Sequence, residues 1–176
     1  MKANFKKILL ALMLIGFTAV NFKATAQDDK ASRPSPPASV TQKVGDASII
    51  INYGQPSVNG RKIWGELVPY NEVWRTGANE ATTFETDKDI TVEGKTLPAG
   101  KYGFFTVPGE NQWAIVFNKV PNQWGAFKYD EKQDYLRVNV KPKKSPEFNE
   151  KLVYNINAEG KVAIAWENLL VSFNIK

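Results

Sequence analysis

The residue types best suited to binding a ligand gather in one stretch of the chain, between residues 53 and 81. Four of them make directional, paired hydrogen bonds, namely Arg61, Arg75, Asn79 and Glu80. Aromatic side chains lie among them at Trp64, Tyr70 and Trp74. This combination predicts a small pocket in which Arg75 holds an anionic or hydroxylated group while Asn79 and Glu80 orient it. Alternatively, Arg75 and Glu80 form an ion pair that pins a long connection to the fold, because a loop needs partners for its own polar groups.

Carboxylates offer the only catalytic chemistry that the sequence suggests. The chain has no histidine and no cysteine, which removes the Ser-His-Asp and Cys-His nucleophile systems and the usual zinc ligands. Glu66, Glu72 and Glu80 lie in one connection, and two of them facing each other would resemble the carboxylate pair of a glycosidase. Glu72 and Glu80 are the catalytic candidates. No cofactor is expected, and no metal either, because the aspartates lack the ligand spacing of a calcium loop.

Tryptophan is abundant, with five residues in the chain. Trp113 and Trp166 occupy apolar positions of alternating runs, which predicts core packing. Trp124, like Trp64 and Trp74, lies in less regular sequence. These three are candidate platforms on which a sugar ring stacks.

The first 26 residues have the three parts of a secretory signal peptide. A basic start precedes an apolar run of about 13 residues, and the small residues Ala24-Thr25-Ala26 follow. That run is shorter than the roughly 20 residues that a membrane-spanning helix needs. We expect cleavage between Ala26 and Gln27 and a periplasmic or secreted protein with no integral membrane segment after cleavage.

Removal of this segment changes the charge of the chain. The full sequence has 23 Lys+Arg and 18 Asp+Glu, and the first 26 residues contain four lysines and no acid. The remainder is therefore almost neutral and lacks the basic field that drives nucleic-acid binding. The partners expected are a small polar ligand, a glycan or an envelope protein, and not nucleic acid.

From Ala38 onward, short runs of alternating apolar residues predict β-strands. Runs on either side of Gly45-Asp46 predict one hairpin, and Lys101–Val107 with Gln112–Asn118 predict another. Further strands are expected at residues 135–140, 152–156, 162–166 and 169–175. About nine or ten strands predict a single all-β domain over residues 38–176, an antiparallel β-sandwich with a jelly-roll-like arrangement. Core burial alone must stabilise it, because no disulfide is available.

Two segments depart from this pattern. Residues 27–37 are polar and rich in proline, which predicts a flexible leader. Residues 54–80 show little alternation, yet they carry too many large apolar side chains to remain in solvent. We therefore expect one long, ordered and irregular connection packed on the sheets, with a short helical turn around Ile63 to Leu67.

Several motifs of this chain resemble a bacterial family. They are GRKIWG at 60–65, LVPY at 67–70, VWRTGANEAT at 73–82, LPAGKY at 97–102, FTVPG at 105–109, FNK at 117–119, WG at 124–125 and RV at 137–138. Over roughly residues 36–176 the chain is similar to the uncharacterised proteins of domain of unknown function 2911. The resemblance implies an exported protein of Gram-negative bacteria, and it implies no established activity, catalytic residue or cofactor.

Together these observations favour an exported, non-catalytic binding domain of unknown ligand, with a site formed by residues 61–80 and Trp124. Two alternatives remain open. One is a carboxylate-dependent hydrolase that acts on glycans, and the other is a purely structural scaffolding protein of the envelope.

Overall fold

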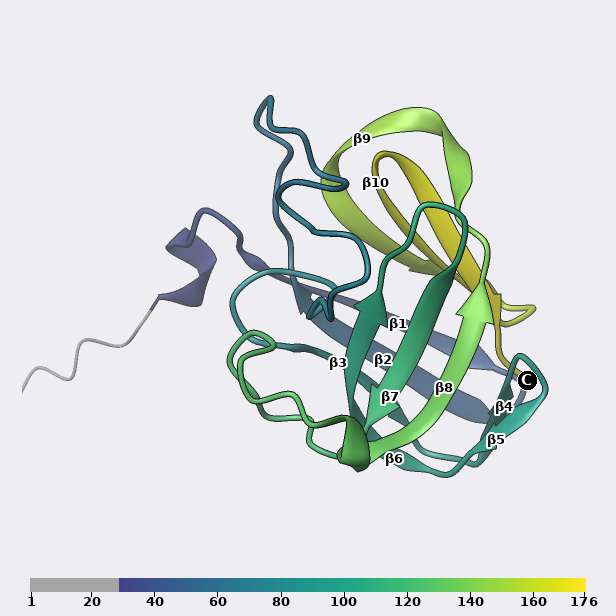
Figure 1. Ribbon diagram of the computed structural model, residues 1–176. Coiled ribbons are helices and arrows are strands. Elements are labelled where there is room, and N and C mark those ends of the chain that lie inside the picture. The colour runs from purple at the N-terminus through teal and green to yellow at the C-terminus, as the bar shows by residue number, and fades with distance from the viewer. Residues whose placement is uncertain (1–28) are drawn as a thin grey trace, which may run out of the picture.

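The computed structural model describes residues 29–176, which form an all-β sandwich (Figure 1). The signal peptide and the cleavage site predicted from the sequence lie outside the described residues. The strands are β1 (Pro37–Val44), β2 (Ala47–Gly54), β3 (Thr82–Thr86), β4 (Ile90–Val92), β5 (Lys95–Leu97), β6 (Gly100–Val107), β7 (Trp113–Asn118), β8 (Asp134–Val140), β9 (Lys143–Ile156) and β10 (Lys161–Asn174). Two short 3-10 turns, η1 (Lys30–Ser32) and η2 (Glu131–Gln133), complete the regular elements of this part of the chain. The predicted fold class is confirmed.

One layer of the sandwich is an antiparallel sheet with strand order β1-β2-β3-β6-β7-β8. The second layer is the long β9-β10 ribbon, and the small β4-β5 hairpin is joined to its end by a bridge between Val92 and Ile175. Both predicted hairpins are present as β1-β2 and β6-β7. The first turns at Gly45, whose φ of 57° is one that glycine adopts without strain.

Aromatic side chains join the two layers. Apolar residues alternate along the strands, so one face of each layer is buried against the other. Phe104 of β6 stacks on Phe173 of β10 with ring centroids 5.9 Å apart, and it packs edge-on against Phe117 of β7 at 5.5 Å. Trp113 and Trp166 are 0% and 2% exposed, which confirms their predicted place in the core.

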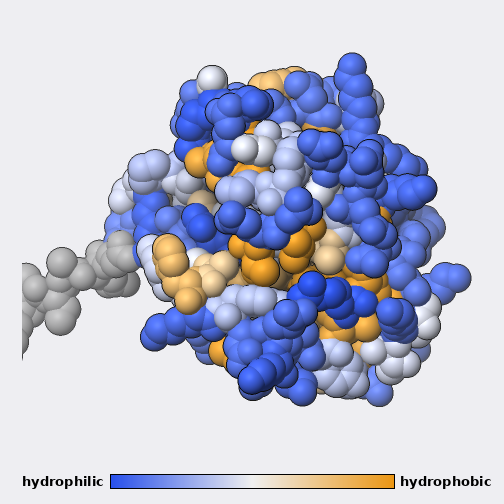
Figure 2. Space-filling view, viewed as in Figure 1, coloured by the Kyte–Doolittle hydropathy of each residue, from blue (hydrophilic) through white to orange (hydrophobic). Residues whose placement is uncertain are grey.

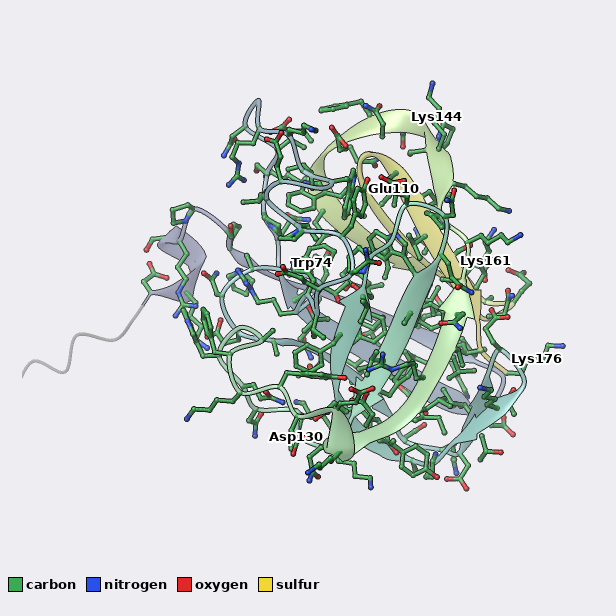
Figure 3. The ribbon with its side chains drawn as sticks, viewed as in Figure 1. Trp74, Glu110, Asp130, Lys144, Lys161 and Lys176 are labelled. Carbon is green, nitrogen blue, oxygen red and sulfur yellow. The ribbon has the colours of Figure 1, made fainter. Side chains whose placement is uncertain are left out.

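The connection between β2 and β3 is ordered and packed, as the sequence predicts. Trp74 (Figure 3) exchanges two backbone hydrogen bonds with Thr106 of β6, at 2.8 and 3.0 Å, and so extends the sheet beyond Thr82, where β3 begins. Trp64 packs on the rings of Trp74, Trp113 and Trp166 at centroid distances of 5.8, 5.1 and 5.9 Å. This tryptophan cluster fixes the connection to both layers.

The expected helical turn near Ile63 is wrong. The backbone N–H of Val68 donates to the Ile63 carbonyl at 2.9 Å, and the N–H of Gly65 donates to the Val68 carbonyl at 2.9 Å. Gly65 has a φ of 81°, which lies in the left-handed region and is incompatible with a right-handed helix. The segment therefore forms a compact loop rather than a helical turn.

The C-terminal ribbon is more continuous than predicted. The two strands expected at 162–166 and 169–175 are the single strand β10, which carries a register shift around Glu167. Glu167 has a φ of 54°, so the chain bends there without leaving the sheet. β9 begins at Lys143, before the predicted start at residue 152. The sequence did not mark residues 143–151 as a strand because they are mostly exposed and show no apolar alternation. Within residues 29–176, no helix has the length and apolar character needed to span a membrane.

Candidate functional site

A cleft of about 340 Å³ lies over β1, β2 and β3 on the outer face of the six-stranded sheet. Its floor includes three polar residues in a row, Ser39, Asn52 and Thr83, one from each strand. Strand register aligns them, because Ser39 pairs with Asn52 and Asn52 pairs with Thr83. Their neighbours Ile51 and Phe84 are 0% exposed in the core, so the alternation of a strand directs the row away from it.

The polar groups of this floor have no partner among the described residues. Thr83 Oγ1 is buried and makes no hydrogen bond. The side chains of Ser39 and Asn52 are exposed and likewise make none within residues 29–176. Gln123 Oε1, in the loop beside Thr83, is a further buried acceptor without a partner. A buried polar group left unpaired costs about 1–3 kcal/mol, so a polar guest that supplies hydrogen bonds is favoured here.

The N-terminal segment 29–36 forms one wall of the cleft. Lys30 Nζ lies 2.8 Å from Glu80 Oε1, and Arg33 Nη1 donates to Glu80 Oε2 at 2.9 Å. Asn79 Nδ2 donates to the backbone carbonyl of Ser35 at 2.8 Å. The sequence predicted a flexible leader over residues 27–37, of which residues 27 and 28 lie outside the described part. The described portion makes specific contacts with the two residues that precede Ala81.

Glu80 is held as an anion. The hydrogen bond from Lys30, with a further one from Arg33, lowers the pKa of Glu80 to about 2. At neutral pH this carboxylate therefore has no proton to donate as a general acid. The predicted ion pair between Arg75 and Glu80 is wrong, because the partners of Glu80 come from the N-terminal segment.

A second cleft of about 260 Å³ adjoins the first and shares Glu80, Ala81 and Thr83 with it. Its other wall is the loop segment 121–124, which ends in Trp124. The Trp124 side chain is 57% exposed, and the guanidinium carbon of Arg33 lies 5.8 Å from its ring centroid. The predicted platform residue thus lines the second cleft, beside Arg33 of the first.

The loop that carries Trp124 is fixed from both ends. A Cβ atom at Gly103 would lie 2.7 Å from the Val120 carbonyl oxygen, so only glycine lets the loop approach β6 this closely. Further along, the Tyr129 hydroxyl donates to Asp134 Oδ2 at 2.6 Å, and Arg137 Nη2 donates to the same oxygen at 2.9 Å. Burial, followed by the hydrogen bond to Asp134, raises the pKa of Tyr129, so its hydroxyl remains a donor.

Apolar side chains also pack together on the outer face of the six-stranded sheet. Ala81, Phe105 and Val116 form a small buried cluster there, separate from the core between the layers. The space-filling view is mostly hydrophilic, with hydrophobic atoms exposed near its centre (Figure 2). Cleft walls of mixed polarity are typical of ligand sites, which combine apolar contact with a few polar groups.

Most of the predicted site residues lie elsewhere. Asn79, Glu80 and Trp124 come together around the clefts, whereas five others line neither cleft: Arg61, Trp64, Tyr70, Trp74 and Arg75. Arg61 donates to the backbone carbonyls of Val58 and Ser57 and so closes its own loop. The Tyr70 ring covers Gly65, where a Cβ atom would lie 3.1 Å from it.

Arg75 does not reach Glu80. Its backbone carbonyl accepts from Thr82 at 3.2 Å, and its Nε atom is buried without a partner among residues 29–176. Burial lowers the pKa of Arg75. Of the three candidate carboxylates, Glu66 pairs with Lys62 at 2.9 Å, and Glu72 is exposed. Neither lines a described cleft, so Glu80 has no second carboxylate beside it there.

Sequence reasoning missed the floor and the leader contacts, which involve Lys30, Arg33, Ser39, Asn52, Thr83 and Gln123. The available signal was weak, since each floor residue is a polar position in a strand of alternating polarity. Such positions are usually just solvent-facing. Only the register of three strands reveals that these form a line.

The comparisons with known proteins identify a family. A family model described as Protein of unknown function (DUF2911) matches residues 35–175. The searches of curated proteins and of solved structures found no match. The matched region contains the whole floor row, Asn79, Glu80 and Trp124, whereas Lys30 and Arg33 precede it.

Proposed function

This chain belongs to the DUF2911 family of proteins of unknown function, and from its cleft geometry we propose that it is an exported, non-catalytic binding domain. Its ligand is a small polar molecule or a glycan held over Ser39, Asn52 and Thr83. The observation that carries the proposal is this row of aligned polar side chains, which make no hydrogen bonds within the described chain although they line a cleft.

The electrostatics of the cleft favour binding over hydrolysis. A glycosidase needs a protonated carboxyl group and a second carboxylate at about 5–10 Å. Glu80 is ionised at neutral pH, and the described lining of the two clefts includes no other carboxylate. Ser39 and Asn52 offer hydroxyl and amide groups, which both donate and accept hydrogen bonds. These groups suit the hydroxyls of a polar ligand.

The burial of Thr83 limits which floor residues a ligand can contact first. Its Oγ1 atom is covered, so a ligand first meets Ser39 and Asn52 at the exposed part of the floor. Contact with the two unpaired oxygens of Thr83 and Gln123 requires the side chains that cover them to move aside. Their unmet hydrogen bonds then contribute to ligand binding rather than to folding.

The test is a ligand screen on the mature protein, residues 27–176, with matched variants. Small polar molecules and oligosaccharides are screened by thermal shift, because a ligand at 100 times its Kd stabilises the folded state by about 2.7 kcal/mol. Asn52→Ala should abolish the shift. Thr41→Ala is the control, since Thr41 is exposed on the same face of β1 and lies outside the cleft. A ligand that binds Asn52→Ala as tightly as the unchanged protein contradicts the assigned site.

Export is tested separately. Expression of the full chain in a Gram-negative host should yield a periplasmic or secreted protein whose mass corresponds to cleavage between Ala26 and Gln27. An intact N-terminus in the cytoplasmic fraction contradicts this part of the proposal.

A further inference from the structure

The floor row gives the cleft a direction. Ser39, Asn52 and Thr83 lie on adjacent strands, so the row runs across the sheet and perpendicular to the strands. Neighbouring strands are about 4.8 Å apart, which makes the row roughly 10 Å long. β1 is the outermost strand of its sheet, so the row reaches the edge of the sheet at Ser39.

The other end of the row is closed. The residue that pairs with Thr83 on the next strand is Gly103, and the Val120 carbonyl lies directly over it. Beyond Thr83, the wall is made by the loop that carries Gln123 and Trp124. The two clefts share Glu80, Ala81 and Thr83, so the second continues the first toward the Trp124 ring. The combined groove is open at one end and blocked at the other.

This shape and chemistry select one class of ligand. Glu80, the one carboxylate in the described lining of the groove, is paired with two cations, Lys30 and Arg33, so the groove has no free negative charge to attract a cation. The polar positions of the floor repeat at the strand spacing, which is close to the repeat of sugar rings in an extended β-1,4-linked chain. An α-1,4-linked chain coils and does not keep this spacing in a straight line.

We propose that the groove holds the end of a linear β-1,4-linked glycan, with its terminal rings over the floor row and against Trp124. This inference rests on the proposed binding function and makes it more specific. A blocked groove accepts a chain end and leaves the rest of the chain to extend past β1. An open groove would instead accept any internal segment.

Calorimetric titration of the mature protein with sugars of increasing length tests the proposal. The probes are glucose and the cello-oligosaccharides of two to six units, the corresponding chito-oligosaccharides, and the malto-oligosaccharides as the linkage control. Affinity for at least one β-1,4 series should rise with each unit up to about three, by roughly fivefold per added unit for one net hydrogen bond each, and then level off. The malto-oligosaccharides should show no such rise.

Two variants of the loop that carries Trp124 test whether the end of the glycan lies against this ring. Trp124→Ala should weaken binding of the β-1,4-linked trisaccharide roughly fivefold to tenfold, as expected for the loss of an aromatic contact. Phe127→Ala is the matched control, because Phe127 is 85% exposed on the same loop and lines neither cleft. Its affinity should be unchanged. Both side chains are largely in solvent, so neither substitution disturbs the core.

The outcomes separate this inference from the proposed function. Affinity that is independent of length, equal affinity for the α-linked and β-linked trisaccharides, or equal effects of the two loop variants overturns the glycan-end proposal. If another polar ligand then binds in a manner that requires Asn52, the proposed binding function stands although the glycan-end proposal is overturned. If no ligand requires Asn52, both proposals are overturned.

Discussion

Replacing Tyr154 with phenylalanine tests how the long connection between β2 and β3 is held to the core. The Tyr154 hydroxyl donates to the backbone carbonyl of Thr76 at 2.7 Å, and the Tyr154 side chain is buried. Thr76 has a φ of 52°, an uncommon conformation for a β-branched residue, so its neighbours must hold it in place. The substitution removes one oxygen and leaves the ring packed against Tyr53 at 4.5 Å.

The expected loss follows from the contacts that remain. A buried hydrogen bond contributes about 0.5–1.5 kcal/mol to stability, and an acceptor left unpaired costs more. The Thr76 carbonyl still accepts from Thr82 Oγ1 at 3.0 Å, so it is not left without a donor. We therefore expect Tyr154→Phe to lower the free energy of unfolding by about 1 kcal/mol. For a chain of this size, that corresponds to a fall in Tm of roughly 2–4 °C.

Urea unfolding and calorimetry of residues 27–176 measure this difference. Tyr135→Phe is the control, since Tyr135 is 43% exposed and its hydroxyl has no hydrogen bond within the described residues. It should change stability by less than about 0.5 kcal/mol. Burial raises the pKa of Tyr154 well above 10. The stabilisation by its protonated hydroxyl is therefore fully present at neutral pH, and it is lost only as the pH rises above 10 and through the raised pKa. Equal stability of the two variants at pH 7 would refute the assigned role of the hydroxyl.

Three further substitutions test the connection and the leader. Gly54→Ala places a Cβ atom 2.1 Å from the Ala78 carbonyl oxygen, so we expect a loss of about 1–3 kcal/mol in urea unfolding. Trp64→Ala removes the ring that contacts three other tryptophans and should cost about 3 kcal/mol in the same measurement. Glu80→Gln should speed tryptic cleavage after Lys30 without a large change in global stability, because this ion pair is partly exposed. The pKa of Glu80 is lowered to about 2. The stabilisation that Glu80 gives to the contacts of residues 30–36 is therefore present above about pH 4.5 and is lost as the pH falls toward 2. Backbone NMR of residues 30–36 can follow this loss.

The parts of the fold that local sequence patterns specify were predictable. The β1-β2 and β6-β7 hairpins are marked by turn residues between alternating runs, and Trp113 lies at an inward position of such a run. Where the local pattern does not reflect how the strands pair, the prediction made from it is wrong. Glu167 and the polar residue after it read as a turn, yet the chain only bends there, because pairing with β9 resumes on either side.

The candidate site depended on information that is not local. Asn52 and Thr83 face each other only because β2 and β3 pair in one register, and a shift by one residue would turn one of them into the core. Proximity in sequence suggested Arg75 as the partner of Glu80. The chain bends between these two residues, however, with φ of 52° at Thr76 and 62° at Asn79, so their separation in sequence does not fix where their side chains lie. The cations that reach Glu80 come instead from residues 29–36, whose composition had suggested mobility.

The boundary of the family match separates the roles of leader and floor. It begins at residue 35, after Lys30 and Arg33 but before all three floor residues. What the family model describes therefore includes the aligned polar row and Glu80, and it does not include the cations that neutralise Glu80 here. The floor of the proposed binding site therefore lies within the family match, whereas two of the cations in its wall lie before it. In this chain, Lys30 and Arg33 form part of that wall and pair with Glu80.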